Sequence, residues 1–94
     1  MKIGISKKKE WEIVEVKELG TNAGEARPYT RQIALLQSDK EKVSTLFHEM
    51  LHCASFDYEL GLTENQVRGI EKWFKKVNDR QDLVTIFAAF QEDT

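Results

Sequence analysis

Two histidines separated by three residues are the part of this sequence best suited to chemistry. His48 and His52 belong to the segment His48-Glu49-Met50-Leu51-His52, an HExxH pattern, and they are the only histidines in the chain. On a helix, residues i and i+4 share a face, so both imidazoles can reach one metal ion. Glu49 projects beside them, where it can take a proton from a metal-bound water. The pattern therefore predicts Zn²⁺ held by His48 and His52, with Glu49 as the general base of a hydrolysis.

A zinc site of this kind needs a third protein ligand, which has to be a carboxylate or a residue from another chain because no further histidine is present. Glu64 and Glu71 are the candidates. They are seven residues apart on a predicted second helix, so they lie within about 20° of each other around its axis. They differ by about 10 Å along that axis. Simple hairpin geometry favours Glu71, which lies about as deep in the second helix as His52 does in the first, and both glutamates stay open at this point.

Length and composition predict one small globular domain over residues 1–94. The chain is 40% hydrophobic and 32% charged, which is typical of a folded domain rather than a disordered segment. A formal net charge of −2 gives no basic footprint for nucleic acid or for an anionic membrane. No stretch is apolar enough to cross a bilayer, and the lone Cys53 fits a reducing cytoplasm and a buried structural role.

The helices that must position the histidines can be read from apolar spacing. Residues 38–58 carry an apolar stripe at helical intervals, preceded by a capping box from Ser38 to Glu41. His48 and His52 lie off that stripe, which predicts that they face something other than the main core. Thr63 and Gln66 form a second capping box before residues 64–77. The short connection predicts two antiparallel neighbouring helices, and a short third helix follows.

The residues before residue 38 read as strands and turns. Residues 3–5, 11–16 and 30–36 are rich in apolar and β-branched side chains, whereas residues 20–24 give a loop signal. The predicted fold is α+β, a small antiparallel sheet of about three strands packed on the HExxH helix. The strand over residues 30–36 is expected to offer a free edge on which an extended peptide could add.

Two segments around the motif resemble a known group. Residues 45–54 read TLFHEMLHCA and residues 56–67 read FDYELGLTENQV. They resemble small phage and prophage proteins classed as HExxH metallopeptidases, distant relatives of the ImmA/IrrE and SprT-like groups, over roughly residues 33–78. In that group a Glu opens the second helix, with apolar residues three and six positions later, and Glu64, Val67 and Ile70 match. The resemblance favours Glu64 as third ligand. The spacing of Glu71 from His52, in contrast, is similar to that of the thermolysin-like gluzincins, whose third ligand is a Glu on a following helix.

These observations lead to competing hypotheses about function. The first is a zinc-dependent peptidase of minimal gluzincin type, phage-encoded and cytoplasmic in the host, as the resemblance implies. Its substrate would be a peptide or protein, and analogy with ImmA-like proteins suggests a repressor or other regulator. The second is a metal-stabilised binding or regulatory module that cleaves nothing, and a third is a metal-free helical interaction protein. By residue type alone, Tyr29, Arg31 and Tyr58 are candidates to stabilise a transition state.

Overall fold

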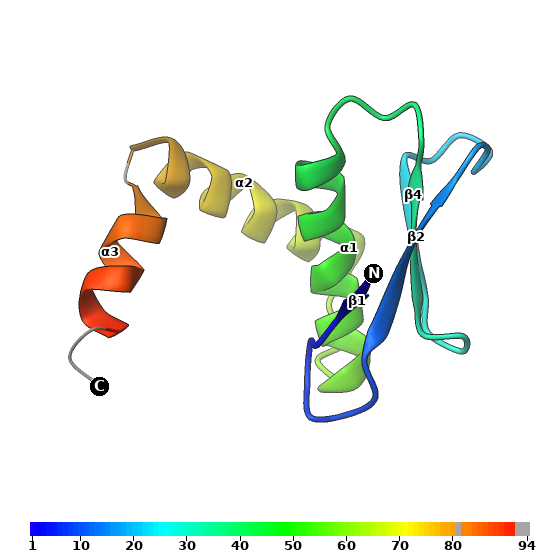
Figure 1. Cartoon of the computed structure of the whole chain (residues 1–94), viewed down its shortest axis with the longest axis horizontal. Helices are drawn as coiled ribbons and strands as arrows, with labels where there is room; N and C mark the ends of the chain where they lie inside the picture. The colour runs from blue at the N-terminus through cyan, green and yellow to red at the C-terminus, as the bar shows by residue number, and fades with distance from the viewer. Residues whose placement is uncertain (81, 92–94) are drawn as a thin grey trace.

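The computed structural model describes residues 1–80 and 82–91, which form a sheet and three helices. The elements in chain order are β1 (Lys2–Ile3), β2 (Trp11–Val16), β3 (Gly24–Arg27), β4 (Gln32–Leu36), α1 (Lys42–Asp57), α2 (Glu64–Arg80) and α3 (Leu83–Gln91). Figure 1 shows the sheet on one side of α1, with α2 and α3 extending away on the other. The predicted α+β class is confirmed.

The sheet has four strands in the described residues, in the order β1-β2-β4-β3. β1 and β2 are antiparallel and so are β3 and β4, whereas β2 and β4 are parallel. The sheet is therefore mixed rather than antiparallel throughout. The additional strand, β3, begins at Gly24, where the sequence predicts a loop. Its residues Gly, Glu, Ala and Arg have little intrinsic preference for a strand, so pairing with β4 is what makes it one.

The position of β4 corrects the expectation about the free edge. The predicted strand over residues 30–36 is present as β4, but it lies between β2 and β3. The backbone of β4 is therefore hydrogen-bonded to a neighbouring strand on both sides, and it cannot accept an added peptide strand. The edge next to α1 belongs to β3.

The core lies between α1 and one face of the sheet. Trp11, Ile33, Leu35 and Cys53 form a buried cluster, against which Leu46, Met50 and several residues of the sheet pack. Cys53 is buried as predicted, and burial raises the pKa of its thiol to about 12. The predicted apolar stripe is wrong at its ends, because Val43 is 85% exposed and Tyr58 is 57% exposed. Val43 lies in the first turn of α1 and Tyr58 follows its last turn, both beyond the reach of the short sheet.

The two predicted capping boxes have different outcomes. α1 begins at Lys42, and its N-cap Glu41 makes no side-chain cap bond. Asp39, not Ser38, accepts hydrogen bonds there, from the Glu41 backbone N–H and from the Thr45 hydroxyl. The second box is confirmed: the Gln66 backbone N–H donates to the Thr63 hydroxyl at 3.1 Å, and the Thr63 N–H donates to the Gln66 side chain at 2.8 Å. Glu64 is thereby held in the first turn of α2.

A buried carboxylate ties the end of α1 to the sheet. The Asp57 side chain is 0% exposed. It accepts hydrogen bonds from the Ser6 hydroxyl at 2.8 Å, from the Trp11 indole N–H at 3.0 Å and from two Arg31 nitrogens at 2.9 and 3.0 Å. The Arg31 guanidinium also lies 4.6 Å from the centre of the Trp11 ring and donates to the Lys9 carbonyl. Ser6, Trp11, Arg31 and Asp57 are called the Asp57 cluster below.

The second helix crosses α1 in the predicted antiparallel sense. Glu64 at its start lies against His52, whereas Glu71 lies against Ser44, two turns earlier on α1. Beyond this contact, Figure 1 shows α2 diverging steeply from α1 and α3 turning downward from the far end of α2. Among the residues that the structure describes, no helix is both long and apolar enough to cross a membrane.

Candidate metal centre

The site is built where the middle of α1 meets the start of α2. The Nε2 atom of His48 lies 2.8 Å from one carboxylate oxygen of Glu64, and the Nε2 atom of His52 lies 2.8 Å from the other. The two imidazole rings are 5.0 Å apart between centres. One ligand atom from each of the three residues lies within 4.8 Å of the other two. The structure thus brings together both histidines and Glu64 as a group that could hold a metal ion.

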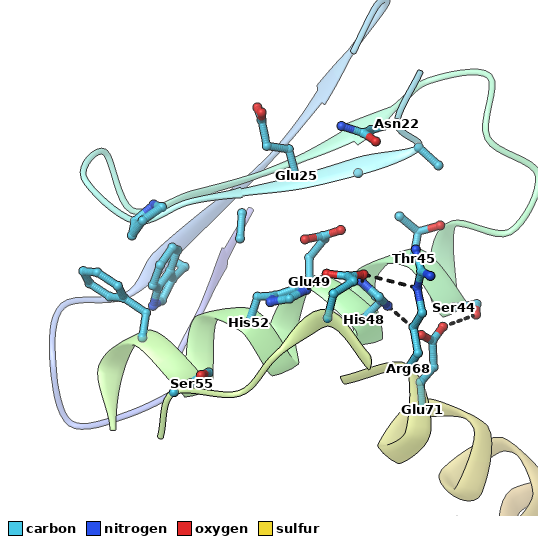
Figure 2. Close-up of a pocket in the computed structure, with 18 of the residues that line it drawn as sticks. Asn22, Glu25, Ser44, Thr45, His48, Glu49, His52, Ser55, Arg68 and Glu71 are labelled. Atoms are coloured by element: carbon cyan, nitrogen blue, oxygen red, sulfur yellow. Dashed lines mark hydrogen bonds and ion pairs between the residues drawn. The ribbon is translucent and has the colours of Figure 1, made fainter. Parts of the chain in front are cut away.

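Glu71 occupies a different position in this arrangement. Its carboxylate lies 2.6 Å from Nδ1 of His48, on the opposite side of the ring from Glu64. The Ser44 hydroxyl donates to its other oxygen at 3.1 Å. Figure 2 shows Glu71 rising from α2 to meet both residues of α1. Of the two candidate ligands, only Glu64 faces the Nε2 atoms. His48, His52, Glu64 and Glu71 are called the His–Glu cluster below.

Glu49 lies beside this group and beneath β3 (Figure 2). It is 8% exposed. Burial raises the pKa of its carboxyl, and the charge of Glu64 adds to this, although His48, His52 and a hydrogen bond from the Ala26 backbone act in the opposite direction. The protein therefore holds a carboxyl of increased basicity next to the His–Glu cluster, as a general base requires.

The close approach of β3 depends on Gly24. A Cβ atom at this position would lie 2.5 Å from the Thr45 methyl group and 3.2 Å from Cγ of Glu49. Only glycine leaves room for the strand to pass this near to α1. The sequence signal around Gly24 predicted a loop, and Gly24 was not among the predicted site residues. A glycine inside a strand, marking a close backbone approach, is the signal that could have identified it.

Two residues of the cluster, His48 and Glu64, have shifted pKa values. Partial burial lowers the pKa of His48, but the hydrogen bond to Glu71 and the charges of Glu49, Glu64 and Glu71 outweigh it and raise this pKa overall. Burial raises the pKa of Glu64, but both histidines outweigh it, so this pKa is lowered. Without a metal ion, the charged forms of His48 and Glu64 are therefore each stabilised by their neighbours.

A cleft opens over these residues. It is lined on one side by residues 22–26 and on the other by α1 residues from Ser44 to Phe56, with Glu64, Arg68 and Glu71 of α2 closing one end. The Ala23 carbonyl accepts a hydrogen bond from the Leu36 N–H at 2.8 Å, within the sheet. Because backbone groups alternate in direction along a strand, those of Gly24 and Ala26 point to the free edge, over the cleft.

The three residues proposed by type as transition-state stabilisers do not line this cleft over the described residues. Arg31 is bound in the Asp57 cluster, Tyr29 is 96% exposed, and Tyr58 follows the end of α1. Arg68, which was not among the predicted site residues, does line the cleft and lies 3.5 Å from Glu64. Its place four residues after Glu64, on the same helical face, is the signal that could have indicated it.

The donor set fits a zinc ion in kind and in number. Two imidazole nitrogens and one carboxylate oxygen leave a fourth position open, as in catalytic zinc sites. No protein-family model, no curated protein and no solved structure matches the chain. Function is therefore inferred from the site itself.

Proposed function

We propose that this protein is a zinc-dependent peptidase in which His48, His52 and Glu64 hold the metal and Glu49 is the general base. The convergence of two Nε2 atoms and one carboxylate within 4.8 Å carries the proposal. The buried Glu49 supports it, because it lies next to this group rather than in solvent. A bound zinc ion would supply Lewis acidity and lower the pKa of a coordinated water.

The chain's own residues would do the rest. The buried Glu49 carboxylate, next to the proposed ligands, would accept the proton from the attacking water and pass it to the leaving amine. Arg68 is the cation that lines the cleft nearest to Glu64, and it would face negative charge developing on the substrate. Its side chain is 69% exposed, so it would take up this position once a substrate displaces solvent.

The free edge of β3 supports a peptide as substrate. The outward backbone groups of Gly24 and the Ala26 carbonyl could pair with an extended chain, which would add to the sheet as a fifth strand, whereas the Ala26 N–H already donates to Glu49. Such a chain would pass over Glu49 and the His–Glu cluster, since all of them line the same cleft. On the basis of the resemblance noted above, we propose that the substrate is a cytoplasmic regulatory protein of the phage or of its host.

The test combines metal content with hydrolysis. The purified chain is loaded with equimolar zinc and incubated with a mixture of unstructured peptides, and products are identified by mass spectrometry. We expect the wild type to cleave, and Glu49→Gln to keep its zinc while its rate falls by roughly 100-fold or more. The exposed Glu12 of β2 offers a matched control, Glu12→Gln, which should keep both. A wild type without zinc, or an unimpaired Glu49→Gln variant, would refute the proposal.

A metal-stabilised binding module is the second candidate function. The observation that favours it is the absence from the cleft, over the described residues, of Tyr29, Arg31 and Tyr58. In that case the wild type would bind zinc in the same assay and release no product. Glu49→Gln would then bind zinc and partner as the wild type does.

A further inference from the structure

His48 is held at both ring nitrogens, whereas His52 is held at one. Nε2 of His48 faces Glu64 at 2.8 Å and Nδ1 faces Glu71 at 2.6 Å. For His52, the structure places only Glu64 within ion-pair distance, at 2.8 Å from Nε2, among the described residues. The two histidines of the motif therefore differ in how strongly their rings are fixed.

The carboxylate on Nδ1 decides the tautomer of a neutral imidazole. A nitrogen that binds a metal must present its lone pair, so the proton has to reside on the other nitrogen. Glu71 is an acceptor only, and at 2.6 Å from Nδ1 it lies closer than Glu64 does to Nε2, at 2.8 Å, so it favours the proton on Nδ1. Nε2 is then free to act as the ligand atom.

The position of Glu71 is itself fixed from two sides. The Ser44 hydroxyl donates to its second oxygen at 3.1 Å, and Ser44 lies one helical turn before His48 on the same face of α1. One turn along α2, Phe74 stacks on Phe47 of α1 with 4.6 Å between ring centres. The side chain of Glu71 is only 24% exposed. It is thus bound between two helices rather than solvated among the neighbouring lysines.

We propose that Glu71 is a positioning residue that orients His48 and holds it in the Nδ1-protonated tautomer, and that Glu71 is not itself a metal ligand. The inference rests on the metal-binding part of the proposed function. It assigns different roles to two glutamates on one face of α2: Glu64 completes the donor set, and Glu71 prepares one of the donors. Carboxylates that orient a ligating histidine commonly raise metal affinity by 10- to 100-fold.

The first test measures zinc affinity by competition with a chromophoric chelator. We expect Glu71→Ala to bind one zinc per chain with an affinity reduced by about 10- to 100-fold. Glu71→Gln, which keeps an oxygen that can accept from Nδ1, should fall between Glu71→Ala and the wild type. Glu12→Gln should bind as the wild type does. An affinity of Glu71→Ala equal to that of the wild type would overturn the inference, and so would a complete loss of zinc equal to that of Glu64→Ala, because the latter would make Glu71 a ligand.

The second test needs no metal. Long-range ¹⁵N NMR on the metal-free chain, at a pH where His48 is neutral, reports which ring nitrogen carries the proton. We expect His48 to be protonated mainly on Nδ1 in the wild type and to shift towards Nε2 protonation in Glu71→Ala, where Glu64 is the remaining acceptor, with His52 unchanged. An unchanged His48 tautomer would overturn the inference even if zinc binds. A wild type that binds no zinc would instead refute the proposed function, and this measurement would still decide whether Glu71 sets the His48 tautomer. Circular dichroism of each variant checks that it folds.

Discussion

The α1 helix carries two charged clusters that differ in almost every physical respect. The Asp57 cluster, at its C-terminal end, is sealed: the Asp57 side chain is 0% exposed, and donors from Ser6, Trp11 and Arg31 satisfy it. The His–Glu cluster, at its middle, is open: Glu64 is 49% exposed and lines a cleft. In the first, one acid meets one guanidinium. In the second, two imidazoles meet the carboxylates of Glu64 and Glu71, with that of Glu49 beside them.

This difference separates a structural ion pair from a site prepared for a ligand. A sealed cluster with every polar atom paired has nothing left to offer a partner, and its removal leaves uncompensated charge in the core. An open cluster with an excess of acids has unused acceptor capacity, which a cation can take up. Perturbed groups occur in both clusters, so a perturbed pKa alone does not identify a functional site. Access to solvent and an unbalanced charge are the properties that distinguish the functional site.

The largest expected effect comes from a substitution that breaks the Asp57 cluster. We expect Asp57→Ala to destabilise the fold by about 3 kcal/mol, because Arg31 would lose its buried partner. Thermal unfolding followed by circular dichroism measures this against Asp79→Ala, an exposed aspartate on α2, which should change stability little. Zinc affinity measured below the melting temperature should stay close to that of the wild type. A zinc affinity that falls with the Asp57 substitution would show that the two clusters are not independent.

The next largest effect is expected from zinc binding at the His–Glu cluster. At a free zinc concentration of about 100 times Kd, binding should stabilise the wild type by about 2.7 kcal/mol, seen as a rise in Tm that a chelator reverses. His52→Ala removes a proposed ligand and should abolish the rise. A Tm that zinc raises equally in both proteins would place the metal elsewhere.

A smaller effect concerns the strand above the cleft. Gly24→Ala would place a methyl group 2.5 Å from the Thr45 methyl and 3.2 Å from Glu49, so β3 must move away from α1. We expect a loss of roughly 1–3 kcal/mol, the usual cost of overpacking, together with slower hydrolysis at unchanged zinc content. The exposed Gly20, in the preceding loop, has a positive φ of 62°. Because alanine is strained at that φ, Gly4→Ala, where nothing lies within 4 Å of the added carbon, is the better control.

The smallest effect is in the pH dependence of stability, and it has opposite signs in the two clusters. The pKa of Asp57 is lowered, chiefly by the hydrogen bonds from Arg31, so its contribution is present at neutral pH and is lost as the pH falls below the usual aspartate range. The pKa of His48 is raised in the metal-free protein, so its contribution is present below about pH 6.5 and is lost as the pH rises through the raised pKa. Melting curves of metal-free wild type and His48→Ala should therefore converge towards alkaline pH. Divergence there would contradict the assigned pairing.

The His–Glu cluster was partly predictable because the sequence patterns that specify it are local. HExxH sets two histidines on one helical face. The capping box from Thr63 to Gln66 marks the start of α2, because Thr63 immediately precedes Glu64, the first residue of the helix. Helical spacing alone did not decide between Glu64, which the resemblance favoured, and Glu71, since the choice depends on how steeply α2 leaves α1. β3 was missed because its four residues have little strand preference and owe their conformation to β4. The Asp57 cluster was missed because Ser6, Trp11, Arg31 and Asp57 are brought together only by the tertiary fold.

The most direct measurement of the central claim is anomalous diffraction from a zinc-loaded crystal. We predict one zinc ion bound by Nε2 of His48 and Nε2 of His52 at about 2.0–2.1 Å and by a Glu64 oxygen at about 2.0–2.2 Å, with Glu71 still on Nδ1 of His48. An ion held elsewhere on the chain, or a pair of imidazole rings turned away from each other with Glu64 unbound, would contradict it.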